Sequence, residues 1–461
     1  MTHTIVSLVL LAAALTNCPL SLAQDSSQGR LVDQTGPVQW IKDDYVSARR
    51  LAIKTQRPLF IDFWAPWCHS CLSMKHTVLA DPALAPMAKR FVWLSVDTDR
   101  PVNVELIKRF PVQVWPTFLV VDAETEDLRS RLLGSATLAS FLVFLEAGLR
   151  PANQTPIPDK PEVLDPAHAL TLADRMATIG HADEARKLFL TAEAGLAPDE
   201  VARCDLAHRT VHLEYSQKEW VRCFDKARAQ MGVATSCGTM SGVEFVRLGA
   251  LCASRLGEGA NVDAVKTFRI RATQAVAGLC EQAANRLAPD DRSECLKLQR
   301  TLADQLGDQD VARSLAIRQR ALLDRACAEA KSPEEVMTFN WPRVEVYTYL
   351  GIPGELIKDL EENVRALPDE YDPPYRLAWI LLKSKRPQEA LAPAKRALAL
   401  VYGPRKGRVL GLVADIYLAL GDHAEARQHY AAAHALYASM SGARWTKLAE
   451  RYQKKVKALS Q

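Results

Sequence analysis

The chain has 461 residues, which is enough for two or three domains that each bury a core. Hydrophobic residues make up 48% and charged residues 24%, as in ordinary soluble globular proteins. Lys and Arg total 58 against 54 for Asp and Glu, a net charge of +4. Because this balance is nearly even, it gives no electrostatic reason to expect nucleic acid or an anionic membrane surface as a partner.

The first 23 residues predict a signal peptide (1–23). The run "IVSLVLLAAAL" is apolar, covers only about half a bilayer, and is followed by the small residues of "SLAQ". The run is preceded by no Lys or Arg, only by His3. A lipoprotein route through Cys18 stays open but is less favoured, because Asn17 is larger than the residue usually cleaved there. We therefore expect a periplasmic or otherwise exported protein with no membrane span in the mature chain.

Between residues 24 and 150, helix and strand patterns alternate, which predicts an α/β domain with a sheet covered by helices. The expected elements, in chain order, are a helix in 43–56, a strand in 58–64, a helix from about His69 that ends or kinks at Asp81-Pro82, a strand in 91–97, a short helix in 103–110, a strand in 117–122, an edge strand in 129–134 and a helix in 137–149.

Residues 151–166 predict a semi-rigid linker. With Arg150 they read "RPANQTPIPDKPEVLDP", and proline neither donates to a hydrogen-bond ladder nor favours helix in the residue before it. The linker divides the chain into two units of unlike pattern, which we expect to fold independently.

Residues 167–461 are nearly all helical and partly repetitive. Small and aromatic residues recur at offsets 0, 4 and 7, which lets two antiparallel helices approach closely. The three clearest sets are Ala185, Phe189 and Ala192; Ala390, Ala394 and Ala397; and Ala426, Tyr430 and Ala433. The spacing resembles the tetratricopeptide repeat, with a period of about 34 residues. Residues 200–345 match it poorly, and an irregular helical bundle remains the alternative.

The stretch "DFWAPWCHSC", residues 62–71, carries a C-x-x-C pair where a buried strand runs into a helix. At the helix start, free backbone amides and the positive end of the helix dipole favour the thiolate of Cys68. Cys71 lies one turn further on the same face, close enough for a disulfide and less exposed. This placement suits Cys68 to attack and Cys71 to resolve.

Together with "VWPTFLVVD", this stretch resembles the thioredoxin family, and most of all the C-terminal thioredoxin-like domain of the bacterial transmembrane thiol–disulfide interchange reductase. The resemblance covers residues 38–148 and includes the "TVLADP" after the active-site helix and Gly134 after the last strand. It implies a thioredoxin fold, with Cys68 as nucleophile and Cys71 as resolving thiol.

The resemblance also implies roles for residues outside the pair. Asp62 would be a buried acid, its pKa raised by burial, that takes the proton of Cys71. Pro116 would be a cis-proline that holds the substrate backbone. Trp67, Trp115 and Thr117 would lie beside the substrate.

The chain departs from the family pattern at four positions. Between the cysteines it has His-Ser, and a charged His69 would favour the Cys68 thiolate and make the pair more oxidising. A neutral, solvent-facing His69 is the alternative. Trp93 stands where thioredoxin has a lysine near the buried acid, which weakens the role carried over to Asp62. The bulk of Trp115 is expected to narrow the set of substrates.

Other interpretations of the C-x-x-C pair are less favoured. A zinc site needs about four ligands, and the chain has no second C-x-x-C. Copper capture by Cys68, Cys71 and His69, or two merely structural thiols, also remain open. We expect no metal and no cofactor.

Seven further cysteines lie in the helical region: Cys204, Cys223, Cys237, Cys252, Cys280, Cys295 and Cys327. Such a number fits an oxidising compartment. Cys204 with Cys223, and Cys280 with Cys295, have separations that would join the two helices of a hairpin, and an odd number leaves one thiol over. Buried reduced cysteines are the alternative.

The sequence thus predicts an exported thiol–disulfide oxidoreductase that reduces or exchanges disulfides in client proteins. Its partners would be those clients and a reducing or oxidising protein, with the helical repeats recruiting clients or a larger assembly. The alternative is an interaction scaffold whose thioredoxin-like domain is structural or redox-sensing.

Overall fold

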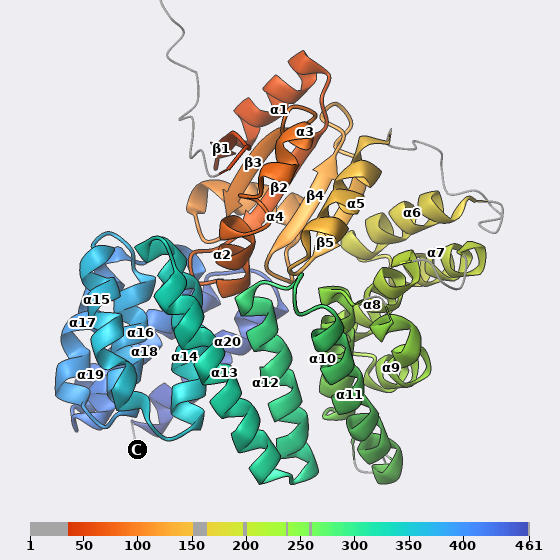
Figure 1. The fold of residues 1–461 in the computed structure, drawn as a ribbon. Coiled ribbons are helices and arrows are strands. Elements are labelled where there is room, and N and C mark those ends of the chain that lie inside the picture. Colours follow the sequence, from red (N-terminus) through yellow and green to blue (C-terminus); the bar gives the residue numbers. More distant parts are fainter. Residues whose placement is uncertain (1–35, 151–163, 197–200, 237, 258–260, 460–461) are drawn as a thin grey trace, which may run out of the picture.

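The computed structural model describes residues 36–150, 164–196, 201–236, 238–257 and 261–459, and shows a sheet domain followed by a helical region (Figure 1). The predicted signal peptide, Cys18 and most of the predicted linker lie outside these residues. No helix in the described part of the chain is long and apolar enough to cross a membrane.

The sheet domain contains a five-stranded sheet in the order β1-β3-β2-β4-β5. Its strands are β1 (Trp40–Lys42), β2 (Leu59–Trp64), β3 (Val92–Asp97), β4 (Thr117–Val121) and β5 (Leu128–Leu133). β3 runs parallel to β1 and β2, whereas β4 is antiparallel to β2 and β5. The four expected strands are present, with β5 at an edge as predicted. β1 was not predicted, because three residues are too few for a periodic signal.

Helices cover both faces of the sheet, which confirms the α/β prediction. They are α1 (Tyr45–Thr55), α2 (His69–His76), α3 (Ala85–Ala88), α4 (Val104–Arg109) and α5 (Leu138–Leu149), with short 3-10 turns at Pro82–Leu84 and Pro101–Asn103. Phe60 of β2 packs with residues of α2 and α5, and its neighbours Leu59 and Ile61 pack with α1 and α4. Successive strand residues therefore point to opposite helical layers.

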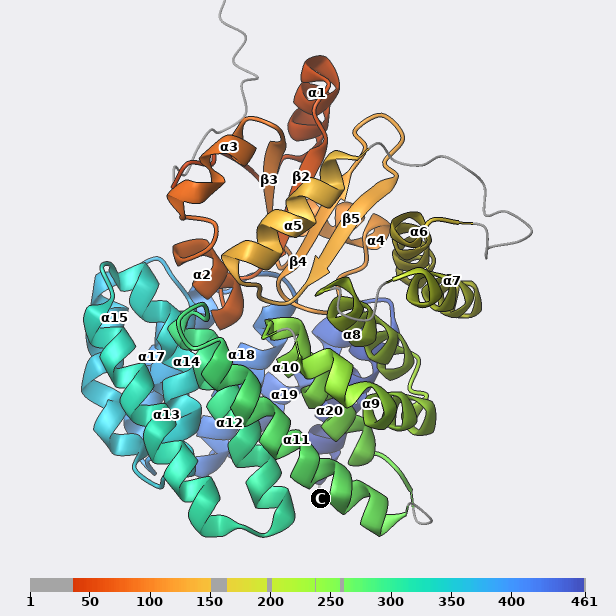
Figure 2. The same ribbon diagram turned by 45° about the vertical axis from the view of Figure 1, so that its right-hand side comes forward.

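The helical region is a series of helices that pack on their neighbours in sequence (Figures 1 and 2). Its helices are α6 (Pro166–Thr178), α7 (Ala182–Gly195), α8 (Val201–Ser216), α9 (Trp220–Thr235), α10 (Met240–Ala253), α11 (Val262–Gln282), α12 (Pro289–Leu306), α13 (Gln309–Glu329), α14 (Pro333–Tyr349), α15 (Ile357–Ala366), α16 (Asp372–Lys383), α17 (Pro387–Leu400), α18 (Lys406–Ala419), α19 (His423–Ala438) and α20 (Ala443–Ala458), with 3-10 turns at Pro353–Leu356 and Gly403–Arg405. The described residues between 201 and 345, where the repeat pattern matches poorly, form helix pairs as well.

The repeat positions predicted from spacing are buried between these helices. Ala390, Ala394 and Ala397 are fully buried on α17, and Ala426 and Ala433 flank the buried ring of Tyr430 on α19. Small side chains thus lie where neighbouring helices approach. The prediction of an all-α helical repeat region is confirmed.

The helical region holds disulfides that join neighbouring helices. Cys280–Cys295 links α11 to α12 as expected. Cys223 pairs with Cys252 on α10, so the expected pairing of Cys204 with Cys223 is wrong. Cys204 lies near the start of α8 and Cys223 near the start of α9. Because neighbouring antiparallel helices have their starts at opposite ends, the two sulfurs are far apart. The Cys204 sulfur instead lies 3.0 Å from the Val233 carbonyl oxygen near the end of α9.

Cys204 is itself disulfide-bonded. Cys237 lies outside the described residues. Cys327 is the free thiol of the described part of the chain, which agrees with the prediction that an odd number leaves one over.

The sheet domain sits over the arc of helices, with α2 directed toward them (Figures 1 and 2). α2 contacts α12 and α14. At the β5 edge of the sheet, Arg131 forms an ion pair with Asp174 of α6 at 2.8 Å. The linker pattern alone did not indicate this docking, because it says where two units are joined and not whether they pack together.

Candidate active site

The dithiol lies where the sequence predicts it, at the first turn of α2. β2 ends at Trp64, and Cys68 is the N-cap of α2, its sulfur accepting a hydrogen bond from the Cys71 amide at 3.1 Å. Cys68 and Cys71 are joined by a disulfide, with Cα atoms 5.2 Å apart. A sulfur at the N-cap receives both the free amides and the helix dipole, so this position favours the thiolate once the disulfide is reduced.

Asp62 occupies the middle of the sheet, opposite Ser95 of β3 and Phe118 of β4. It is buried, and its Oδ1 has no hydrogen-bond partner among the described residues. Burial raises the pKa of Asp62 to about 7, and the positive charge of Lys75 on α2 lowers it only in part. The carboxyl group can therefore exchange a proton near neutral pH.

Lys75 was not singled out by sequence reasoning. Trp93, which stands where thioredoxin has a lysine, is a core residue whose ring lies 4.3 Å from that of Phe60. The sequence did contain a signal for a positive charge near Asp62, because Lys75 lies on the helix that begins at the C-x-x-C motif.

The loop before β4 approaches the dithiol through a cis Trp115-Pro116 peptide bond. The Ser70 hydroxyl donates to the Trp115 carbonyl at 3.4 Å, and the Gly134 amide donates to the Pro116 carbonyl at 2.8 Å. The Thr117 hydroxyl donates to the Val114 carbonyl at 2.7 Å, so it holds the loop. These contacts bring the α2 start and the loops at Pro116 and Gly134 to one place.

Two tryptophans pack against the cysteines. The rings of Trp67 and Trp115 are 5.4 Å apart, and both residues contact the Cys68–Cys71 pair. Trp67 Nε1 donates to Asp99 at 2.7 Å, and Trp115 Nε1 donates to Thr98 at 2.8 Å. The loop after β3 therefore fixes the orientation of both rings.

His69 points to the helical region rather than to solvent. Its Nδ1 lies 2.9 Å from both carboxylate oxygens of Asp290 on α12, and its Nε2 lies 4.0 Å from Glu294. Burial lowers the pKa of His69, but the charge and hydrogen bond of Asp290, with the charge of Glu294, raise it to about 9. The solvent-facing alternative is therefore wrong, and the imidazole is a paired cation at neutral pH.

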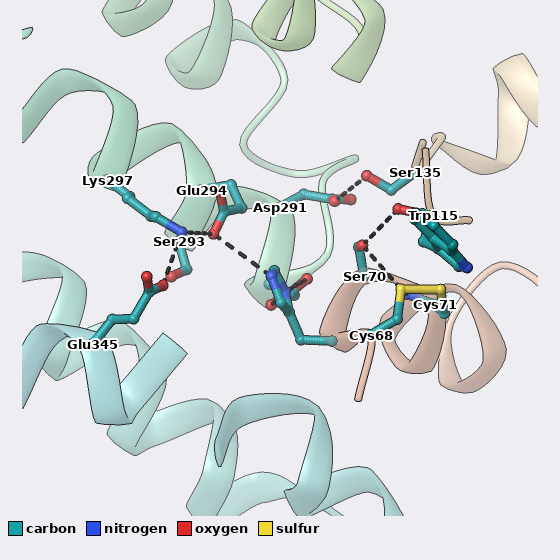
Figure 3. A network of polar contacts seen from close by, with 12 residues as sticks. Cys68, Ser70, Cys71, Trp115, Ser135, Asp291, Ser293, Glu294, Lys297 and Glu345 are labelled. Atoms are coloured by element: carbon teal, nitrogen blue, oxygen red, sulfur yellow. Dashed lines mark hydrogen bonds and ion pairs between the residues drawn. A yellow bond between two sulfur atoms is a disulfide. The ribbon is translucent and has the colours of Figure 1, made fainter. Parts of the chain in front are cut away.

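The polar contacts continue along α12 (Figure 3). Glu294 pairs with Lys297, which also pairs with Glu345 on α14 at 2.8 Å. Beside them, the hydroxyl of Ser135, next to Gly134, donates to Asp291 at 2.7 Å. Burial and the charge of Asp290 raise the pKa of Asp291 to about 7.

Three arginines of the helical region contact the two tryptophans, two over the rings and one at the backbone. The Arg405 guanidinium is 4.9 Å from the centre of the Trp67 ring, and that of Arg444 is 5.0 Å from the Trp115 ring. Arg376 Nη2 donates to the Trp67 carbonyl at 3.3 Å. Sequence reasoning missed these residues and Asp290, because each is an isolated residue in an ordinary helical pattern.

Within the described residues, no group of three or more His, Cys, Asp or Glu side chains is arranged to hold a metal ion. His69, the third ligand of the copper hypothesis, is engaged by Asp290. The site thus combines a disulfide at a helix start, a buried acid with a raised pKa and a loop with a cis-proline beside them.

Comparison with known proteins places the sheet domain in a family. Residues 39–123 match the family model described as thioredoxin-like. A thiol:disulfide interchange protein DsbD from Vibrio vulnificus strain CMCP6 is 32% identical over 129 residues, which are 26% of this chain and 21% of that protein. A DsbD from Ralstonia nicotianae is 30% identical over 143 residues, 30% of this chain and 24% of that protein. The sheet domain is thioredoxin-like, and the chain spans a quarter or less of these relatives.

A tetratricopeptide repeat protein from Parabacteroides merdae is similar in structure to this chain. Its sequence identity is 11% and its TM-score 0.40, over 62% of this chain and 98% of that structure. The description of the helical region as helix pairs depends on its own packing and not on this match.

Proposed function

We propose that this chain is an exported thiol–disulfide oxidoreductase that exchanges disulfides with client proteins through Cys68 and Cys71. The observation that carries the proposal is the position of the pair. Cys68 is the N-cap of α2, which follows the central strand that carries the buried Asp62, and it lies beside the cis Pro116 loop. The domain matches a family model described as thioredoxin-like.

In the reducing direction, the Cys68 thiolate attacks one sulfur of the client disulfide. The client S–S bond breaks, a Cys68–client mixed disulfide forms and the other client sulfur leaves as a thiolate. Cys71 then loses its proton and attacks the Cys68 sulfur, which releases the second client thiolate and forms the Cys68–Cys71 disulfide. Two electrons pass from the dithiol to the client, and the reverse sequence oxidises a client dithiol.

We assign the proton of Cys71 to the Asp62 carboxylate. Asp62 lies on the strand that leads to α2, and period-2 alternation directs its side chain to the layer that contains α2. A pKa of about 7 matches a group that must accept and release a proton during each turnover. Pro116 would present backbone groups to an extended client segment, with Trp67 and Trp115 at its sides.

The interhelical disulfides Cys223–Cys252 and Cys280–Cys295 support an oxidising compartment for the helical region. Export through residues 1–23 and a redox partner that restores the dithiol are part of the proposal. The proposal also includes the recruitment of clients by the helical repeats.

A scaffold function is the second candidate, and one observation favours it. Cys68 is only 4% exposed and Cys71 5% exposed, and Trp67 and Trp115, which pack on the pair, are themselves covered by arginines of the helical region. A structural thioredoxin-like domain docked on its repeats would look the same.

The test is the rate at which the reduced full-length chain reduces a protein disulfide. We expect activity in the wild type and in the Cys327→Ser control, and loss of at least about 100-fold in Cys68→Ser, which has no attacking thiolate. A wild type no faster than Cys68→Ser toward both this protein disulfide and oxidised glutathione, a small disulfide, would replace the oxidoreductase by the scaffold. The equilibrium potential of the pair then gives the direction: near about −270 mV for a reductase and about −120 mV for an oxidant.

A further inference from the structure

The helical region covers the face of the sheet domain on which a client would have to bind. The residues next to the dithiol are Trp67 and His69 in the motif, Trp115 before the cis-proline and Ser135 after β5. Each of the four contacts the helical region. Both cysteines, which lie among these residues, are buried.

One side of this cover is made by the start of α12. Asp290 and Asp291 are consecutive residues in its first turn, and both are buried. Asp290 pairs with His69 of α2, and Asp291 accepts a hydrogen bond from Ser135. Two neighbouring carboxylates of one helix thus engage two different segments of the active site, the start of α2 and the loop after β5.

The other side is made by the turn between α17 and α18 and by the last helix. Arg405 follows this turn and covers Trp67, and Arg444 of α20 covers Trp115. Both arginines are cations beside the buried Asp99, which accepts the hydrogen bond of Trp67. Tyr402 donates a hydrogen bond to Asp97 at the end of β3. Charge on the helical region is therefore complementary to charge beside the dithiol.

Gly403 makes the closest backbone approach on this side. Its φ is +58°, and a Cβ there would overlap the carbonyl oxygen of Asp99. Since the turn at Gly403 is pressed against the loop after β3, any side chain at this position must separate the two domains or distort one of them.

We propose that the helical region is a closed lid over the dithiol, which must swing or slide away before a protein client reaches Cys68. The inference rests on the proposed function, because a lid matters only if the dithiol reacts with clients. It changes the part that the repeats play. In the closed chain, the surface that would recruit a client is occupied by the chain's own thioredoxin-like domain, and a client or partner competes with it.

The physical reason is the size of a protein disulfide. To form the mixed disulfide, a client sulfur must come within bonding distance of Cys68 Sγ with its backbone along the Pro116 loop. Arg405 and Arg444 of the helical region lie over the rings of Trp67 and Trp115, between which the client segment would have to lie. A closed chain therefore gives protein clients access in proportion to the population of the open form.

The test is the rate at which Cys68 of the reduced full-length chain is alkylated by a bulky polyethylene-glycol maleimide, followed by mass mapping of its peptide. Relative to the chain unfolded in urea at the same pH, the wild type should react slowly. Gly403→Ala should raise the rate by about tenfold or more, since it weakens the docking without touching the motif. Gly421→Ala is the matched control, because Gly421 has φ +82° and nothing within 4 Å of the added Cβ.

A second variant keeps the test decisive if Gly403→Ala does not fold, as judged by circular dichroism. Asp290→Asn removes the partner of His69 and should also speed alkylation. Its control is Asp310→Asn, since Asp310 is exposed in the first turn of α13. The lid is refuted if wild-type Cys68 reacts as fast as in urea, or if the folded variants stay within about twofold of their controls.

The outcome is separable from that of the proposed function. Slow alkylation that the two variants relieve, without disulfide reduction by any of them, would uphold the closed arrangement and refute the oxidoreductase. Fast alkylation of a wild type that reduces disulfides would refute the lid and uphold the oxidoreductase. If both proposals hold, Gly403→Ala should also reduce a protein disulfide faster than Gly421→Ala.

Discussion

The carboxyl group of Asp62 lies in the core of the sheet domain with one oxygen unpaired among the described residues. Because its folded pKa is about 7 and its ordinary value 3.8, the folded state binds the proton more tightly. The stabilisation that the proton on Asp62 contributes is fully present below a pH of about 3.8 and is lost as the pH rises through 7.

Asp62→Asn should therefore stabilise the chain increasingly from pH 4 to 7, by at most about 4 kcal/mol, and then by a constant amount. The measurement is the thermal unfolding midpoint of variant and wild type across this range. The same variant should slow disulfide exchange, because Cys71 loses its proton acceptor. A difference in stability that does not change with pH would contradict the assignment.

His69 gives a second pH dependence with the same sign. Its pKa is about 9 in the folded chain against 6.5, so the His69–Asp290 pair stabilises fully below about pH 6.5 and is lost as the pH rises through 9. Glu294 supports the charged form, and Lys297 opposes it.

The stability of the wild type relative to His69→Gln should thus shrink between pH 6 and pH 9.5, by at most about 3 kcal/mol. Taking the difference between the two chains removes the titration of Asp62, whose pKa does not depend on His69. Unfolding midpoints over this interval measure it. A constant difference would mean that His69 is neutral in the folded chain.

At the scale of elements, the interhelical disulfides Cys280–Cys295 and Cys223–Cys252 should stabilise the helical region by restricting the unfolded chain. Cys280–Cys295 closes a separation of 15 residues and Cys223–Cys252 one of 29. Replacing both cysteines of either bridge by serine should cost about 3 kcal/mol, and slightly more for the longer loop.

Denaturant unfolding of the helical region is the measurement, with Cys327→Ser as the control. Cys327 is a free thiol, and its loss should cost clearly less than the loss of a bridge. Equal effects of all three changes would show that the thiols act by packing. Peptide mapping should also recover Cys223 with Cys252 and not with Cys204.

Most elements of the sheet domain were predictable from sequence because they are long enough, and apolar enough, to give a clear pattern. β2, β3 and β4 are central strands with continuous apolar runs, and α2 begins at His69 because the C-x-x-C motif supplies its N-cap. β1 has only three residues. The pairing of Cys223 required knowing which helix ends lie together, which spacing along one chain does not give.

At the scale of the whole molecule, the docking of the two domains was not predictable. The motif, the buried acid and the cis-proline are local patterns within the sheet domain, and a family resemblance carries them. The groups that meet them, Asp290 and Arg405, lie far along the chain as single charged residues on ordinary helices. Contacts of this kind leave no periodicity, so the environment of His69 and the burial of Cys68 came only from the structure.

The central claim is that Cys68 attacks a client disulfide and Cys71 resolves the product. The most direct measurement is the capture of mixed disulfides by the full-length Cys71→Ser variant, with Cys68→Ser as its matched control. Without the resolver, the reaction should stop at the Cys68–client bond. We predict covalent complexes in Cys71→Ser that disappear on reduction, and few in Cys68→Ser. Equal capture by both variants, or capture by neither with no disulfide reduction by the wild type, would contradict the account.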